Sequence, residues 1–139
     1  MNEAVLQLHQ MIGQAQNIVF FGGAGVSTES GIPDFRSAHG LYAGAHGMSY
    51  EDMLSSGYFR AQPDKFWAFY KQVMLYPDAK PNAAHYALAK LEKQGRLKAV
   101  LTQNIDGLHQ AAGSKKVWEL HGTVHQNFCM DCGRCYDLA

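Results

Sequence analysis

Residues 20–37 read FFGGAGVSTESGIPDFRS, a glycine-rich turn that directly follows an apolar run. The run predicts a short buried strand at 17–23, and a wholly apolar strand is typical of a parallel sheet covered on both faces. Glycines after such a strand indicate a tight turn or a backbone that lets a ligand approach closely. We therefore expect this strand to lead into about two helical turns between Gly22 and Arg36, with a ligand beside them.

Helical periodicity and capping signals predict the remaining elements. Apolar residues at helical spacing indicate a helix over 3–15, and Asn82 and Gly95 are typical residues for the start and the end of another. The other expected elements are helices at 50–56, 63–74 and 105–113, strands at 98–104 and 116–122, and a loop at 37–50. Because strands and helices alternate, the predicted fold class is α/β, with a parallel, Rossmann-like sheet and flanking helices.

The topology also predicts where a ligand binds. Right-handed crossovers place the strand ends at Gly22, Gln103 and His121 along one edge of the sheet. Ligands of open α/β sheets bind outside the carboxyl ends of the strands, which is this edge. The three motifs that carry candidate functional residues follow these strands, so all three lie at this edge.

The composition is that of an ordinary globular protein. The 139 residues suffice for one domain with a core but are short for two. Apolar residues make up 47% and charged residues 17%, and twelve basic side chains balance twelve acidic ones, so nothing indicates binding to nucleic acid or to a membrane surface. We see neither a secretory signal nor a membrane span, so a cytoplasmic location is expected.

Each motif has a structural and a functional interpretation. GGAGVST either cradles a phosphate with backbone N–H groups or is only a tight strand–helix turn, since Thr28 replaces the third glycine of the dinucleotide-binding pattern. In TQNIDGLH, Asn104 and Asp106 either cap the following helix or, with Gln103, bind ribose hydroxyls or a carboxamide. His121, in ELHG at a strand end, is the histidine best placed for proton transfer near neutral pH.

Three cysteines lie close together near the end of the sequence. Cys129, Cys132 and Cys135 form CMDCGRC, a spacing that favours a metal or redox role over a disulfide framework. One C-x2-C is half of a structural zinc site, which needs four ligands. Cys135 is either a third ligand or a small apolar residue at the start of a ribbon strand.

The sequence resembles the sirtuin family of NAD-dependent protein deacylases. The resemblance runs from residue 17 to residue 132 and lies in GAGVSTESGIPDFRS, TQNIDGLH, HGT and the following C-x2-C, in this order and spacing. It implies that NAD is bound by Gly23, Ala24, Gly25, Thr28, Phe35, Arg36, Gln103, Asn104, Ile105, Asp106 and His121. Within this set, Asp106 would hold the nicotinamide carboxamide and His121 would be the catalytic base.

The resemblance also implies a function and a domain organisation. The implied function is deacetylation of acetyl-lysine in proteins, with transfer of the acetyl group to ADP-ribose and with nicotinamide as product and inhibitor. Residues 1–124 would be the N-terminal part of the NAD-binding domain, with a helical insertion at about 50–76. Residues 125–139 would begin a small zinc-ribbon module, with Cys129 and Cys132 as ligands of a structural Zn²⁺.

The sequence departs from the family pattern after its cysteines. The second C-x2-C and the later strands of sirtuins do not follow, so we expect an N-terminal portion or a truncated sirtuin, weakly active or inactive, with apolar sheet surface left uncovered. A non-catalytic NAD- or zinc-binding interaction module is the alternative, and a small-molecule oxidoreductase is the weakest interpretation. Tyr70 and Val73 stand where succinyl-preferring sirtuins resemble one another in a Tyr-x-x-Arg pair, which implies a preference for acetyl groups here.

Overall fold

The computed structural model describes residues 2–35 and 49–138. The helices are α1 (Glu3–Gln14), α2 (Tyr50–Met53), α3 (Ser56–Ala61), α4 (Pro63–Val73), α5 (Ala83–Lys93) and α6 (Leu108–Ala111), with a 3₁₀ helix, η1, at Ala24–Ser30. The strands are β1 (Ile18–Gly22), β2 (Leu97–Thr102), β3 (Val117–Glu119), β4 (Asn127–Phe128) and β5 (Cys135–Tyr136). No helix in this part of the chain is long and apolar enough to cross a bilayer. Arg36 and most of the expected loop at 37–50 lie outside the described residues.

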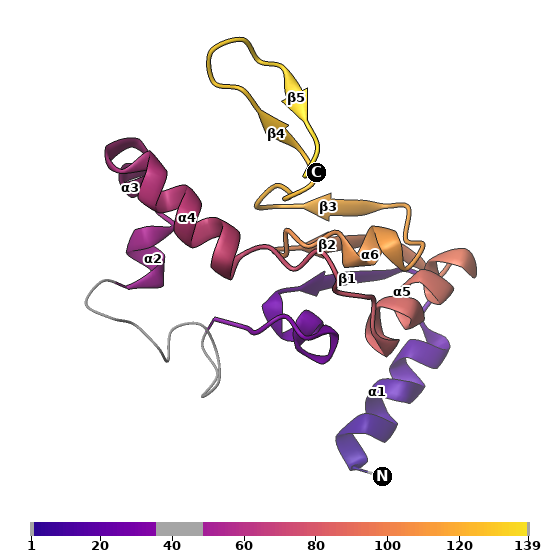
Figure 1. The fold of residues 1–139 in the computed structure, drawn as a ribbon. Helices are drawn as coiled ribbons and strands as arrows, with labels where there is room; N and C mark the ends of the chain where they lie inside the picture. Colours follow the sequence, from indigo (N-terminus) through magenta and orange to yellow (C-terminus); the bar gives the residue numbers. More distant parts are fainter. Residues whose placement is uncertain (1, 36–48, 139) are drawn as a thin grey trace.

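The central feature is a parallel sheet with the strand order β1-β2-β3 (Figure 1). Gly22 pairs with Thr102, and Thr102 pairs with Glu119, so the carboxyl ends of all three strands lie side by side. The first residue after β2 continues this pairing, because the Gln103 amide donates to the Gly22 carbonyl oxygen at 3.0 Å. The predicted α/β class with a parallel sheet is confirmed, and so is the common edge.

The hydrophobic core lies between the sheet and α5. Leu88 of α5 packs against Leu97 and Val100 of β2, and the partly buried side chains around them are Ile18, Phe20, Leu91 and Val117. Full burial of one such aliphatic side chain contributes about 1.5–3 kcal/mol. Partly buried and exposed positions alternate along β1 with the two-residue period of a strand, so the described residues pack against only one face of the sheet.

The other face of the sheet is open within the described residues. Val19 and Phe21 of β1 and Trp118 of β3 are 59, 61 and 65% exposed. The expectation of a sheet covered on both faces is therefore wrong for this part of the chain, whereas the expected uncovered apolar surface is observed. The apolar sequence of β1 does not distinguish a sheet covered on one face from a sheet covered on both, because the side chains on both faces of β1 are apolar.

Helix α5 begins at an asparagine that also contacts η1. The Asn82 side-chain oxygen accepts from the Ala84 amide at 3.0 Å, which confirms the predicted N-cap. The Asn82 side-chain nitrogen donates to the Val26 carbonyl oxygen at 2.8 Å and to Ser30 Oγ at 3.0 Å, both in η1. One side chain thereby starts α5 and fixes the turn that follows β1.

Among the described residues between η1 and α5, three helices are present instead of the two expected. The Ser55 hydroxyl oxygen accepts from the Tyr58 amide at 3.1 Å and so starts α3, which divides the predicted helix at 50–56. Helices α2 to α4 form a group to one side of the sheet (Figure 1). Aromatic rings hold α3 to α4, with the Phe59 and Phe66 ring centroids 4.9 Å apart.

Two further differences concern the end of the chain. Strand β3 ends at Glu119, earlier than the predicted limit at 122, because Gly122 has a left-handed φ of 77° and its amide donates back to the Glu119 carbonyl oxygen. Beyond this turn, β4 and β5 form an antiparallel pair in which Phe128 faces Cys135. The expected strand beginning at Cys135 is present, whereas β4 was not predicted.

Candidate functional site

The candidate site is a cavity of about 930 Å³ at the carboxyl ends of the three parallel strands. Its walls come from η1 and the segment after it, from the end of α4, and from the loops after β2 and β3. The predicted site residues that line it are Ala24, Phe35, Gln103, Asn104, Ile105, Asp106 and His121. The topology thus brings together residues that are up to about a hundred positions apart in sequence.

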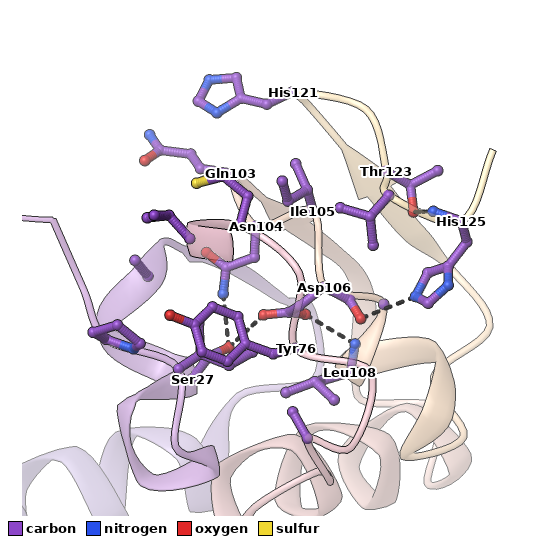
Figure 2. Close-up of a pocket in the computed structure, with 18 of the residues that line it drawn as sticks. Ser27, Tyr76, Gln103, Asn104, Ile105, Asp106, Leu108, His121, Thr123 and His125 are labelled. Atoms are coloured by element: carbon purple, nitrogen blue, oxygen red, sulfur yellow. Dashed lines mark hydrogen bonds between the residues drawn. The ribbon is translucent and has the colours of Figure 1, made fainter. Parts of the chain in front are cut away.

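A hydrogen-bonded group of three polar side chains forms one wall of the cavity. The fully buried Ser27 donates from Oγ to Asp106 Oδ2 at 2.6 Å, and Asn104 Nδ2 donates to Ser27 Oγ at 3.0 Å. Asp106 Oδ1 accepts from the Leu108 amide at 2.9 Å, at the start of α6. Figure 2 shows Ser27, Asn104 and Asp106 gathered around these contacts. Asp106, one residue before the N-cap Gly107, therefore contacts the start of α6 and also lines the cavity.

Ser27 is a site residue that the sequence interpretation missed. The hydroxyl singled out in this motif was that of Thr28, but Thr28 Oγ1 donates to the Gly25 carbonyl oxygen within η1 and the side chain is not part of the cavity wall. A 3₁₀ helix has about three residues per turn, so the adjacent residues 27 and 28 point in different directions. Only the partner of Ser27, 79 residues away, shows which of the two hydroxyls faces inward.

The glycines of the turn differ in what their surroundings require. A Cβ on Gly22 would lie 2.5 Å from the Phe20 ring, so any larger residue there would have to displace that ring. A Cβ on Gly23 would lie 3.1 Å from Gln103 Oε1, whereas a Cβ on Gly25 would meet no atom within 4 Å. The start of η1 thus has open space in front of Gly25, and its N-cap residue Gly23 offers no capping side chain to the first amides.

His121 lies at the rim of the cavity, in the turn after β3. Its side chain is exposed, and Figure 2 shows it apart from the group around Asp106, without a hydrogen bond to the other residues drawn. Gly122 directly after it turns the chain back toward β3. The imidazole is therefore accessible both to the cavity and to solvent.

Two buried histidines lie behind the group around Asp106. His85 of α5 and His109 of α6 are 0 and 1% exposed, and their ring centroids are 4.7 Å apart. His85 Nδ1 accepts from the Asn82 amide at 3.3 Å, whereas no hydrogen bond is observed in the described structure for His85 Nε2 or for either ring nitrogen of His109. Burial lowers the pKa of both imidazoles, the neighbouring His85 lowers that of His109 further, and the Asp106 carboxylate opposes these effects. Both rings are therefore neutral at pH 7.

The cysteines lie away from this cavity, at the β4–β5 pair. The backbone amides of Cys132 and Asp131, followed by the Cys132 side chain, lower the pKa of the Cys129 thiol. A thiolate at Cys129 beside Cys132 fits half of a zinc site. In the described residues, however, no three potential ligands are grouped so that they could hold a metal ion, and Cys135 is exposed on β5.

The comparisons with known proteins agree on one family. The model of the Sir2 family matches residues 23–139. A protein of Clostridium acetobutylicum described as an NAD-dependent protein deacetylase is 57% identical over 138 residues, which cover 98% of this chain and 56% of the relative. The chain thus spans about half the length of the curated relatives that it matches.

Solved structures give the same result. A structure reported for the mechanism and regulation of Sir2 enzymes superimposes with a TM-score of 0.85 at 42% identity, over 99% of this chain and 53% of its own. A Sir2 protein solved with a p53 peptide and NAD⁺ superimposes with a TM-score of 0.80 at 42% identity, over 95% of this chain and 51% of its own.

Proposed function

The chain belongs to the Sir2 family, and on this basis we propose that its protein is an NAD-dependent protein-lysine deacetylase. The reaction transfers the acetyl group of acetyl-lysine to ADP-ribose and releases nicotinamide. The observation that carries the proposal is the arrangement of Ser27, Asn104 and Asp106 in the wall of a cavity that has His121 at its rim. A Sir2 protein solved with a p53 peptide and NAD⁺ supports the assignment of the ligand.

The residues of the site fit a bound NAD molecule. Open space in front of Gly25 and the uncapped start of η1 suit a diphosphate, because backbone N–H groups at a helix start favour anions. Each oxygen of the Asp106 carboxylate accepts one hydrogen bond from the protein and keeps a second acceptor position. That position suits the amide N–H₂ of nicotinamide. We also assign Gln103 and Asn104 to the hydroxyl groups of the adjacent ribose.

The mechanism follows from these positions. When bound, NAD would release nicotinamide and supply the ADP-ribosyl group that accepts the acetyl group. Asp106, kept in place by Ser27 and by the start of α6, orients the nicotinamide end of the cofactor. His121 takes a proton from a ribose hydroxyl, as an exposed imidazole at the rim can. The protein thus contributes orientation of the cofactor and one proton acceptor.

Nicotinamide release tests the proposal directly. The 139-residue chain and a longer chain, completed by the C-terminal part of the C. acetobutylicum relative, are incubated with NAD and an acetyl-lysine peptide. We expect the longer chain to release nicotinamide only when the acetylated peptide is present, and the short chain to be weakly active or inactive. A completed, folded chain that releases none would overturn the proposal.

The alternative is a non-catalytic NAD- or zinc-binding interaction module. It is favoured by the glycine-rich turn and the Cys129–Cys132 pair, because either feature suffices for binding without catalysis. The same assay separates the two functions if binding of ADP-ribose by the 139-residue chain is measured alongside. Binding without nicotinamide release, in the short and the completed chain alike, would favour the module.

We predict a preference for neutral acyl groups over succinyl groups. Tyr70 and Val73 both line the cavity, burial raises the pKa of the Tyr70 hydroxyl, and no described lysine or arginine lines the cavity. A succinyl carboxylate would thus find no cation there, so we expect its kcat/KM to be lower than that of acetyl-lysine by at least about 10-fold. Val73→Arg should reduce the difference in kcat/KM between acetyl-lysine and succinyl-lysine, whereas the matched Val73→Leu should leave it unchanged. A higher kcat/KM on succinyl-lysine would contradict the prediction.

We predict that zinc binds only weakly to the 139-residue chain. Cys129 and Cys132 supply two thiolates, and a closed tetrahedral site needs four ligands. Elemental analysis after dialysis should find well below one zinc per short chain and about one per completed chain. Cys132→Ser should abolish zinc binding by the completed chain, whereas Cys135→Ser should leave it unchanged. If the 139-residue chain binds zinc tightly and Cys135→Ser abolishes this binding, Cys135 is a ligand and the prediction is wrong.

A further inference from the structure

We propose that His125 is a positioning residue for Asp106, a role that rests on the proposed function. Its imidazole holds the backbone of the loop after β2 so that the Asp106 carboxylate faces the nicotinamide end of the cavity. His125 lies four residues after His121, in the same loop. One loop would then carry the proton acceptor and also fix the residue that orients the leaving group.

The first observation is a hydrogen bond between the two loops. His125 Nε2 lies 3.1 Å from the carbonyl oxygen of Asp106. A carbonyl oxygen only accepts, so the ring nitrogen facing it carries the proton and donates. One residue earlier, the Val124 amide donates to the Ile105 carbonyl oxygen at 3.0 Å. The loop after β3 thus holds two successive carbonyl groups of the loop after β2, one by its backbone and one by the His125 ring.

The second observation is the close packing of the ring over Gly107. A Cβ on Gly107 would lie 2.6 Å from His125 Nε2, and Gly107 has a left-handed φ of 71°. The ring therefore occupies the space that a side chain would take at the residue directly after Asp106. Figure 2 shows His125 reaching toward Asp106 from the side opposite Ser27.

These contacts hold Asp106 from several directions. Ser27 and the Leu108 amide bind its two carboxylate oxygens, and His125 binds its carbonyl oxygen. Ser27 is fully buried, whereas His125 is exposed, so His125 is the contact that solvent can replace most easily. Its loss should loosen the loop without unfolding the protein.

The test compares three variants. His125→Leu removes the donor, His125→Gln places a side-chain N–H at similar reach, and Gln126→Ala changes the exposed neighbouring side chain as a control. In the 139-residue chain, exchange of the Leu108 amide with solvent should become about 2- to 10-fold faster in His125→Leu and stay near the parent value in the other two. Imidazole ¹⁵N resonances of the parent should show the proton on Nε2 of His125.

A second measurement separates positioning from a purely structural role. In the completed enzyme, His125→Leu should raise the inhibition constant of nicotinamide by about 2- to 10-fold, while kcat at saturating NAD changes less. Unchanged amide exchange and unchanged nicotinamide inhibition in His125→Leu would overturn the inference while leaving the proposed function intact. If the unmodified completed enzyme releases no nicotinamide, the proposed function fails, and the amide exchange and imidazole spectra still decide whether His125 holds the loop.

Discussion

Replacement of His121 by alanine is expected to reduce deacetylation by about 10²- to 10⁴-fold, the usual cost of losing a general base. The thermal unfolding midpoint should change little, because the His121 side chain is exposed and makes no hydrogen bond to the other residues drawn in Figure 2. The measurement is the rate of nicotinamide release with acetyl-lysine peptide in the completed chain, together with calorimetry of both proteins.

A matched control is His9→Ala, which removes another exposed histidine, on α1 and outside the walls of the cavity. Its activity should equal that of the parent. If His121→Ala keeps activity within about twofold of the parent, another group accepts the proton and the assignment of His121 is wrong.

Acid is expected to destabilise the protein through the buried pair of His85 and His109. Burial lowers the pKa of both rings in the folded state, whereas in the unfolded state each titrates near its ordinary value of about 6.5. Below that pH the unfolded chain binds more protons than the folded chain, so stability falls as pH falls from about 6.5 toward the folded-state pKa values. Each histidine contributes a slope of up to about 1.4 kcal/mol per pH unit in that window.

His109→Leu provides the decisive comparison. Both ring nitrogens of His109 are buried without a hydrogen bond in the described structure, so leucine leaves no new unpaired group behind. The free energy of unfolding, measured with urea between pH 7.5 and 5, should fall less steeply with decreasing pH in His109→Leu than in the parent. The difference in slope should correspond to the uptake of about one proton fewer on unfolding. His9→Ala should keep the slope of the parent. Equal slopes for His109→Leu and the parent would show that the pair does not control the acid sensitivity.

The position of the cavity at the sheet edge could be predicted from the sequence because it depends on topology. Parallel strands joined by right-handed crossovers must end at one edge, so Gln103, Asp106 and His121 could be brought together without knowledge of any side-chain contact. The Asn82 cap was predictable for a similar reason, since a helix start depends on its own few residues.

The remaining features depend on contacts between distant residues. Nothing local distinguishes Ser27 from Thr28 until the Asp106 carboxylate is placed beside one of them. His125 has no recognisable motif, and its role is visible only in its contact with the backbone of another loop. The open face of the sheet was hard to assign because β1 carries apolar side chains on both sides, and the described residues pack against only one of them.

Asn82 also affects how mutational data on this protein should be interpreted. The side chain does not line the cavity, yet it caps α5 and fixes η1 at the mouth of the proposed diphosphate site. A screen scored on activity alone would therefore count Asn82→Ala among the cofactor contacts. Asn82→Asp separates the two effects: aspartate keeps the oxygen that caps the helix and lacks the N–H₂ that holds the turn. If Asn82→Asp folds normally but binds NAD weakly, Asn82 affects cofactor affinity indirectly, through the link that it makes between the start of α5 and η1.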